Sequence, residues 1–222
     1  MTEAEKLIEN ILAEPALASS GILANRLLRE YHRGYPVQTL KPLLANQNEY
    51  VVRLAAFVAS ELGSRAKPLL REMVRLLSHR NLLIRSDAIC AVLTCADRNE
   101  QSAIAAVINL LEDPNWPIRW KTMEFLSLAS LQQLQAGLEH LEKAHSPHVE
   151  ALRWLVRVDE SNIDEIPLWL ESNVSLNRKY GVVAAAKVAS LTYKHLQRAA
   201  SSDDVDVKRF AESVLQTKAA IQ

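Results

Sequence analysis

The sequence predicts an all-α fold, an α-α superhelix built from stacked helical hairpins, and three observations support it. Ala, Leu, Val, Glu, Lys and Arg dominate the composition, and 222 residues include only 5 Gly and 8 Pro, which favours helix. Apolar residues recur at helical spacing, without the alternation typical of strands. A similar segment also returns about every thirty residues. We therefore expect one domain, 1–222, of about six to seven hairpins.

The segment LLEDPNWPIRWKTMEFLSLA, residues 110–129, shows the repeating unit. Two leucines close one helix, and Asp113-Pro114-Asn115 interrupts it. Pro117 then suits the first turn of the next helix, where its missing N–H costs nothing. The residues that follow at helical spacing are expected to share one buried face; they are Ile118, Thr122, Phe125, Leu126 and Ala129.

The same pattern divides the rest of the chain into helix pairs separated by short polar or Gly/Pro turns. Gly34 and Gly63 each follow a helix, as a C-terminal cap would. The segments 1–35 and 190–222 are expected to be capping hairpins. The expected helices are 3–13, 22–32, 37–45, 51–62, 67–77, 82–95, 101–112, 118–130, 134–144, 148–158, 163–171, 176–189, 192–200 and 205–217.

A Val/Ile-plus-charge pair marks the start of most second helices, at intervals of 28 to 34 residues. Three residues after the mark, five of six copies carry a small or tolerant residue, and Arg153 is the exception. A small side chain lets neighbouring helices approach closely, and stacking buries the apolar face that one hairpin cannot bury alone. The five residues are Ala56, Ala88, Thr122, Gly181 and Ala211.

These segments resemble HEAT repeats, particularly the short bacterial type of about thirty residues also found in phycobilin-lyase-like proteins. The resemblance covers 37–217 and is carried by LLEDPNWPIRW, LLSHRNLLIRS and LLANQNEYVVRL. It implies a superhelix in which a turn acid, here Asp113 or Asp204, joins an arginine in a ladder along the stack. It also implies a structural role for Arg53, Arg85, Arg119 and Arg178.

Charge is balanced overall, which argues against a general nucleic-acid binder. It is unevenly spread, because 26–85 has eleven Lys/Arg against four acids, whereas 139–171 has eight acids against three Lys/Arg. These segments are either solvated helix faces or a polar partner surface.

The compartment predicted from the sequence is the cytoplasm. The N-terminus carries acids where a signal peptide needs a basic region, and no run of 18 apolar residues would span a membrane. The two cysteines, Cys90 and Cys95, fit reduced residues in an apolar helix.

Ligand-type side chains cluster only around the turn 145–147, where His140, His145 and His148 alternate with glutamates. Their spacing matches no helical i, i+4 zinc pair, so exposed turn histidines are the favoured interpretation. The sequence also lacks the nucleophile-elbow, phosphate-loop, zinc-protease and dinucleotide motifs. We therefore expect no enzyme, no metal and no cofactor.

Tryptophan and arginine near the starts of second helices indicate a protein-binding surface, since these residue types dominate interface energetics. The alternative is that the indoles fill gaps between Ala-rich repeats, which suits Trp154 and Trp169 best. The candidate protein-binding residues are Trp116, Arg119, Trp120, Glu124, Glu139, Glu142, Glu150 and Trp154.

The leading function is a non-catalytic protein-binding module. Small bacterial proteins of this type resemble immunity proteins that neutralise toxins, and the acidic segment 139–171 would suit a basic nuclease toxin. One alternative is a HEAT-like alkylpurine DNA glycosylase, with roles for Trp116, Trp120, Asp113 and Arg157. A scaffold or a chromophore-lyase-type subunit is another.

Overall fold

The structure is a computed structural model that describes residues 1–159, 161–189 and 193–220. These residues form an all-helical protein and contain no strand. Among the described helices, none has the length and apolar character needed to cross a bilayer. The chain groups into two compact units, Met1–Ala96 and Asp97–Gln222, each of which is described by itself. A single domain over 1–222 stays a prediction.

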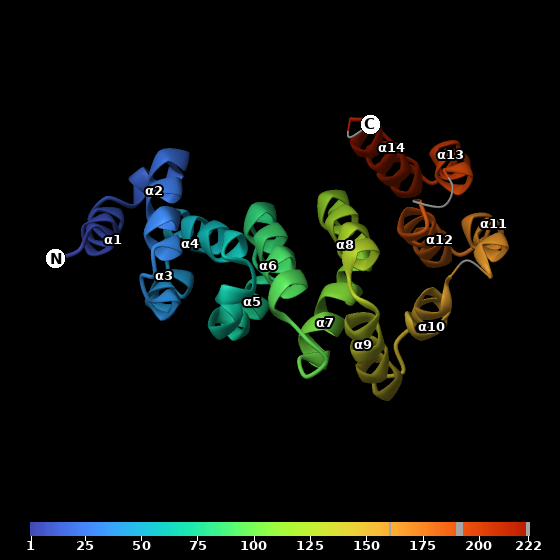
Figure 1. Ribbon diagram of the computed structural model, residues 1–222, viewed down its shortest axis with the longest axis horizontal. Coiled ribbons are helices and arrows are strands. Elements are labelled where there is room, and N and C mark those ends of the chain that lie inside the picture. The colour runs from blue at the N-terminus through green and yellow to red at the C-terminus, as the bar shows by residue number, and fades with distance from the viewer. Residues whose placement is uncertain (160, 190–192, 221–222) are drawn as a thin grey trace. The chain divides into compact units, whose positions relative to one another are not determined.

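Unit 1 stacks its second helices in chain order, so that α2 packs against α4 and α4 against α6 (Figure 1). Three 3₁₀ segments, Pro15–Ser19, Val37–Leu40 and Gly63–Leu69, accompany the α-helices. The α-helices of unit 1 are α1 (Glu3–Ala13), α2 (Gly21–His32), α3 (Lys41–Leu44), α4 (Glu49–Glu61), α5 (Leu70–Leu76) and α6 (Leu82–Cys95).

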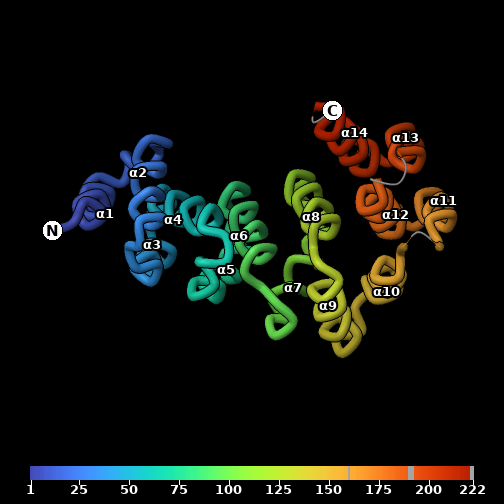
Figure 2. The backbone as a smooth tube through the Cα atoms, in the orientation of Figure 1, coloured from blue at the N-terminus to red at the C-terminus, as the bar shows by residue number. Residues whose placement is uncertain are grey.

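Unit 2 packs differently, because α8, α12 and α14 all contact one another (Figures 1 and 2). Packing here is therefore not confined to successive hairpins. The 3₁₀ segments are Leu110–Glu112 and Ile163–Glu165. The α-helices are α7 (Gln101–Asn109), α8 (Trp116–Leu128), α9 (Leu131–Lys143), α10 (Val149–Arg157), α11 (Ile166–Leu170), α12 (Ser175–Lys187), α13 (Lys194–Ala200) and α14 (Val205–Ala219).

The expected helices are confirmed in number and order, with differences at their ends. The expected helices 37–45, 67–77, 101–112 and 163–171 are each partly 3₁₀. Pro42, Pro68 and Pro167 lie in three of them, where a proline removes one helical hydrogen bond. The expected start at Thr192 lies outside the described residues.

Side-chain caps and glycines fix the hairpin turns. Asn48, Asn81 and Asp204 each accept a hydrogen bond from a backbone amide in the first turn of α4, α6 and α14. Gly34 and Gly63 have φ of 107° and 57°, a left-handed conformation that favours glycine, and they end α2 and α4 as expected.

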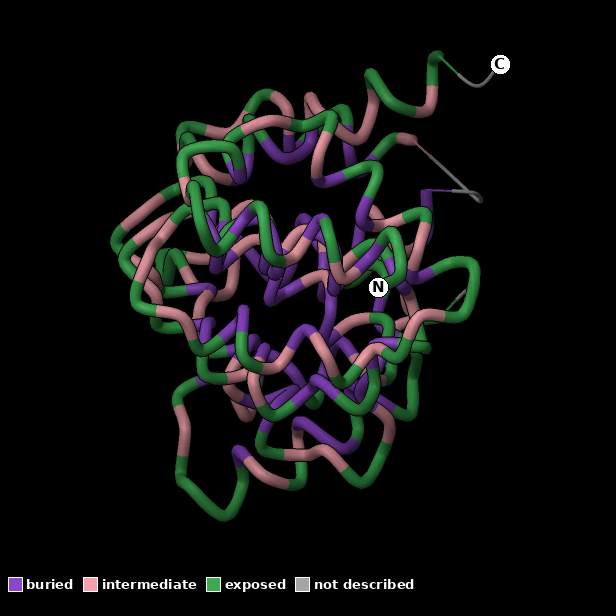
Figure 3. Tube along the Cα trace, turned by 90° about the vertical axis from the view of Figure 1, so that its left-hand side faces the viewer, coloured by how far each residue is buried: buried purple, intermediate pink, exposed green. Residues whose placement is uncertain are grey.

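The small residues after the repeat marks are buried between helices, as their pattern predicts. Ala56, Ala88, Thr122 and Ala211 are all 0% exposed. Arg153, which breaks the pattern, is exposed and pairs with Glu142. The predicted buried face of α8 is also confirmed. Figure 3 colours the trace by burial, and buried stretches alternate with exposed ones along the helices.

Gly181 is the tightest of these contacts, because α12 packs directly on α11 there. A Cβ at this position would lie 2.9 Å from the backbone nitrogen of Leu170 and 3.0 Å from the carbonyl carbon of Trp169. Backbone atoms cannot rotate away as a flexible side chain can. Only glycine therefore fits without moving one helix.

We expect Gly181→Ala to lower the free energy of unfolding of unit 2 by about 1–3 kcal/mol, the usual cost of overpacking. Urea unfolding followed by tryptophan fluorescence measures it, since all four tryptophans lie in unit 2. Gly21→Ala in unit 1 is the control, because no atom lies within 4 Å of its added Cβ; its unfolding is followed by circular dichroism, since unit 1 has no tryptophan. Equal stability of Gly181→Ala and the parent would contradict this packing.

Candidate functional site

One candidate surface is a groove between α8 and α14 in unit 2, with a volume of about 450 Å³. We call it the Trp groove. Trp116 and Trp120 line it from α8, and the α14 residues Arg209, Glu212, Ser213 and Gln216 line it from the other side. Trp116 is 41% exposed, which is unusual for so large an apolar side chain.

Arg209 lies over the face of Trp116, with its guanidinium carbon 5.0 Å from the ring centroid. This cation–π contact holds both side chains in place at the mouth of the Trp groove. Within the part of the chain that the structure describes, neither Arg209 nor Glu212 forms an ion pair. The Trp groove therefore offers a partly exposed indole, together with a cation and an anion whose charges are not paired with an opposite charge.

Trp120, which is half-buried, lines the Trp groove and also contacts a core residue. Its ring packs edge-on against Phe210 of α14, with centroids 6.1 Å apart. Phe210 is 1% exposed. This edge-to-face contact of two aromatic rings stabilises the orientation of the Trp120 indole.

A polar bridge below the Trp groove holds α14 on α8. Arg119 donates to Asp206 through Nε at 2.6 Å and Nη2 at 2.9 Å, a two-pronged ion pair. Its Nη1 donates to the carbonyl oxygens of Asp113 and Pro114 in the turn before α8. Lys179 of α12 lies 3.8 Å from the same Asp206 carboxylate. One carboxylate thus joins three helices.

We expect Asp206→Asn to lower the free energy of unfolding of unit 2 by about 1–3 kcal/mol, because Arg119 and Lys179 lose their counter-charge in a half-buried setting. Thermal unfolding of unit 2 checks this. Glu142→Gln is the control, since it breaks an exposed pair with Arg153 and should cost about 0–1 kcal/mol. The bridge would be unimportant if both variants unfolded at the same temperature.

A buried histidine lies near this bridge, at the start of α10. His148 was expected to be an exposed turn histidine, but it is 0% exposed, because its ring packs inside unit 2 with Nδ1 3.1 Å from the hydroxyl of Tyr180. Its Nε2 lies 3.4 Å from the Glu112 carboxylate. Burial lowers the pKa of His148 below its ordinary value, Glu112 opposes this effect, and Lys179 reinforces it. The imidazole is therefore neutral at neutral pH.

A histidine that is neutral when folded destabilises the protein in acid. The unfolded side chain titrates near pH 6.5 and the buried one at lower pH, so the unfolded state binds more protons in between. The contribution of His148 to the free energy of unfolding is therefore fully present above pH 6.5 and decreases as the pH falls below that value. We expect His148→Gln to show a smaller loss of stability between pH 7 and pH 5 than the parent.

Urea unfolding followed by tryptophan fluorescence at the two pH values measures this difference. His145→Asn is the control, because His145 is exposed, has a φ of 52° that Asn tolerates, and should leave the acid sensitivity unchanged. If His148→Gln lost as much stability between pH 7 and pH 5 as the parent, His148 would not be the cause of the acid sensitivity.

The predicted acidic contact residues lie on the surface of unit 2 outside the Trp groove. Glu124 pairs with Lys121 on α8, and Glu142 pairs with Arg153. Glu139 accepts a hydrogen bond from Gln101 and lines a separate polar hollow, whereas Glu150 is exposed in the first turn of α10. None of these four carboxylates lines the Trp groove.

Trp154 fills a gap between hairpins, the alternative that the sequence left open. It is 5% exposed, stacks on Trp169 with centroids 4.3 Å apart, and donates through Nε1 to Glu165 at 2.8 Å. Its surface is therefore used inside unit 2, and its role in partner binding stays untested. The guanidinium of Arg119 is likewise engaged inside unit 2, by its ion pair with Asp206.

Sequence reasoning missed Arg209, Glu212, Ser213 and Gln216, which form half of the Trp groove. No local signal distinguishes them from any solvated helix face, because the pairing of α14 with α8 spans about ninety residues. Of the residues considered for a glycosylase, Asp113 accepts from Asn115 within its own turn, and Arg157 does not line the Trp groove.

Groups of three or more His, Cys, Asp or Glu suited to a metal do not occur among the described residues.

No protein-family model and no protein of curated function matches the chain. A solved structure described only as an engineered protein is 15% identical, with a TM-score of 0.49. The match covers 99% of this chain and 98% of the other.

Proposed function

We propose that this chain is a non-catalytic, HEAT-like module of the cytoplasm that binds another protein through the Trp groove. The observation that carries the proposal is the exposed indole of Trp116, held by Arg209 beside an uncommitted Glu212. Tryptophan and arginine are the residue types most often found to dominate binding energy at protein interfaces.

The frame under the Trp groove supports this proposal. Trp120 is fixed by Phe210, and α14 is fixed on α8 by the pair of Arg119 with Asp206. A surface held in one conformation loses little entropy when a partner binds. The groove therefore suits an aromatic or aliphatic anchor of a partner, with polar groups that pair with Arg209 and Glu212.

The specific form of the proposal is a bacterial immunity protein that neutralises a toxin. Unit 2 has seventeen acidic against fourteen basic residues, and Glu139, Glu142 and Glu150 are exposed on it. A basic nuclease would be attracted to such a surface, which speeds association and competes with its anionic substrate.

We expect Trp116→Ala and Arg209→Ala to weaken the complex with the toxin encoded beside this gene by about tenfold or more, the effect of losing an interface hot spot. Calorimetry on the co-purified partners measures affinity, and growth of toxin-expressing cells measures protection. Both side chains are exposed, so the variants should keep the parental unfolding temperature.

Leu168→Ala is the matched control, because this leucine is 71% exposed in unit 2 and does not line the Trp groove. It should bind as the parent does. Failure of the neighbouring toxin to form a complex would reject the immunity role. A complex that tolerates Trp116→Ala and Arg209→Ala would reject the Trp groove as the contact.

A further inference from the structure

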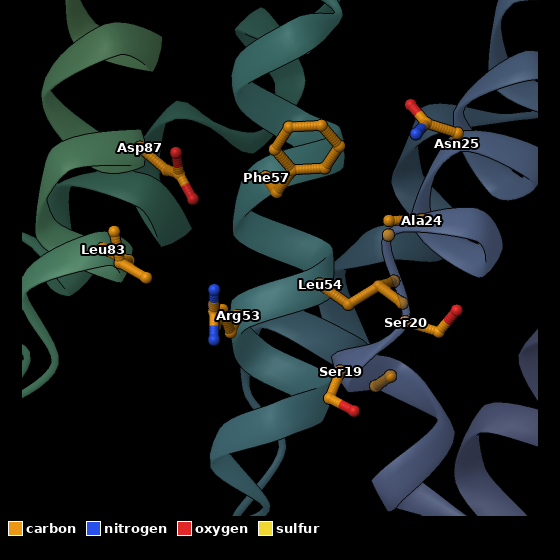
Figure 4. Close-up of a pocket in the computed structure, with 11 residues that line it drawn as sticks. Ser19, Ser20, Ala24, Asn25, Arg53, Leu54, Phe57, Leu83 and Asp87 are labelled. Atoms are coloured by element: carbon orange, nitrogen blue, oxygen red, sulfur yellow. The ribbon is translucent and has the colours of Figure 1, made fainter.

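A second hollow lies in unit 1, where α2, α4 and α6 follow one another, and has a volume of about 230 Å³ (Figure 4). We call it the Arg53 pocket. It is lined by Ala18, Ser19, Ser20, Gly21, Ala24 and Asn25, by Arg53, Leu54 and Phe57 of α4, and by Leu83 and Asp87 of α6.

Arg53 is the cationic side chain of this pocket, and it differs from its counterparts in the repeat. Arg178 occupies the same position in α12 and donates to Ser172 O at 2.8 Å and to Asp204 at 2.7 and 3.0 Å. Arg119 is engaged in the same way in α8. Arg53 is exposed, and no ion pair or hydrogen bond joins its guanidinium to another described residue.

The carboxylate that would be expected to pair with Arg53 on the same helix already binds other residues. Glu49 lies four residues earlier on α4, a spacing that favours an ion pair with Arg53. Instead, Glu49 accepts from Asn81 at 2.9 Å and from Arg80 at 2.8 Å. Hydrogen bonds from Asn81 and Arg80 also lower the pKa of Glu49, which keeps it ionised and bound to them. Among the described residues, no ion pair joins Arg53 either to Glu49 or to Asp87, the carboxylate that lines the pocket from α6.

The residues that line the pocket beside Arg53 determine which kind of group can bind next to its guanidinium. Leu54, Phe57 and Leu83 are apolar, and Leu83 is 50% exposed. Figure 4 shows Arg53 on the side of α4 that faces Leu83 and Asp87 of α6. Ser20 adds a hydroxyl that does not cap its own helix. The volume is smaller than that of a typical small-molecule site, about 300–1,000 Å³, and suits one or two side chains.

We propose that the Arg53 pocket binds an acidic side chain of a partner protein, flanked by an apolar side chain. The carboxylate would pair with the guanidinium of Arg53, and the apolar neighbour would lie against Leu83 and Phe57. A planar guanidinium suits a carboxylate in a two-pronged geometry. The segment 26–85 is strongly basic, which complements an acidic partner segment. This site is separate from the Trp groove and does not rest on it.

The probe is a capped leucine–glutamate–leucine tripeptide, whose only charge is the glutamate carboxylate, titrated into the ¹⁵N-labelled full chain. We expect shifts of the Gly21 backbone amide and the Asn25 side-chain amide, which both line the pocket. Replacing the glutamate by glutamine should weaken binding about fivefold or more, as should Arg53→Gln.

Arg71→Gln is the matched control, since Arg71 is an exposed arginine of unit 1 outside the pocket. It should bind the glutamate peptide as the parent does, and so should Trp116→Ala. Equal affinity for the glutamate and glutamine peptides, parental binding by Arg53→Gln, or no shift at millimolar peptide would each overturn the proposal. None of these results bears on the Trp groove.

Discussion

The packing of unit 2 depends on the ion pairs that the carboxylate of Asp206 forms with Arg119 and Lys179. This carboxylate receives two hydrogen bonds from Arg119 and lies beside Lys179, so one side chain of the last hairpin links α8, α12 and α14. Charges held this far from water are costly unless they are paired, which ties the three helices to one relative position. The Trp groove is a consequence, because its two walls belong to α8 and α14.

The same arginine position serves different purposes along the chain. In α8 and α12 the guanidinium binds backbone carbonyls of its own turn and a carboxylate of a later hairpin. In α4 the carboxylate nearest in sequence is taken by Arg80 and Asn81, and Arg53 faces a hollow instead. A repeated residue that stabilises one repeat is thus available for recognition in another.

Local patterns predicted the helices well, because amphipathic spacing, N-caps such as Asn81 and the glycines at 34 and 63 act over a few residues. The burial of the small residues that follow each repeat mark, including Gly181, was also predictable from the repeat. The partners of Trp116 and Arg119 were not, because α14 lies far along the chain and no short-range signal records that α8 and α14 meet. For the same reason sequence alone left two roles open for Trp154, and only its stacking on Trp169 shows that it is packed.

The link between α8 and α14 also bears on how such a chain can change its length during evolution. In unit 1, where each hairpin contacts its neighbours in order, duplication of a hairpin would extend the row and leave existing contacts intact. In unit 2, an extra hairpin between residues 129 and 204 would displace Asp206 from Arg119. On this packing, an added hairpin is better tolerated in unit 1 than in unit 2.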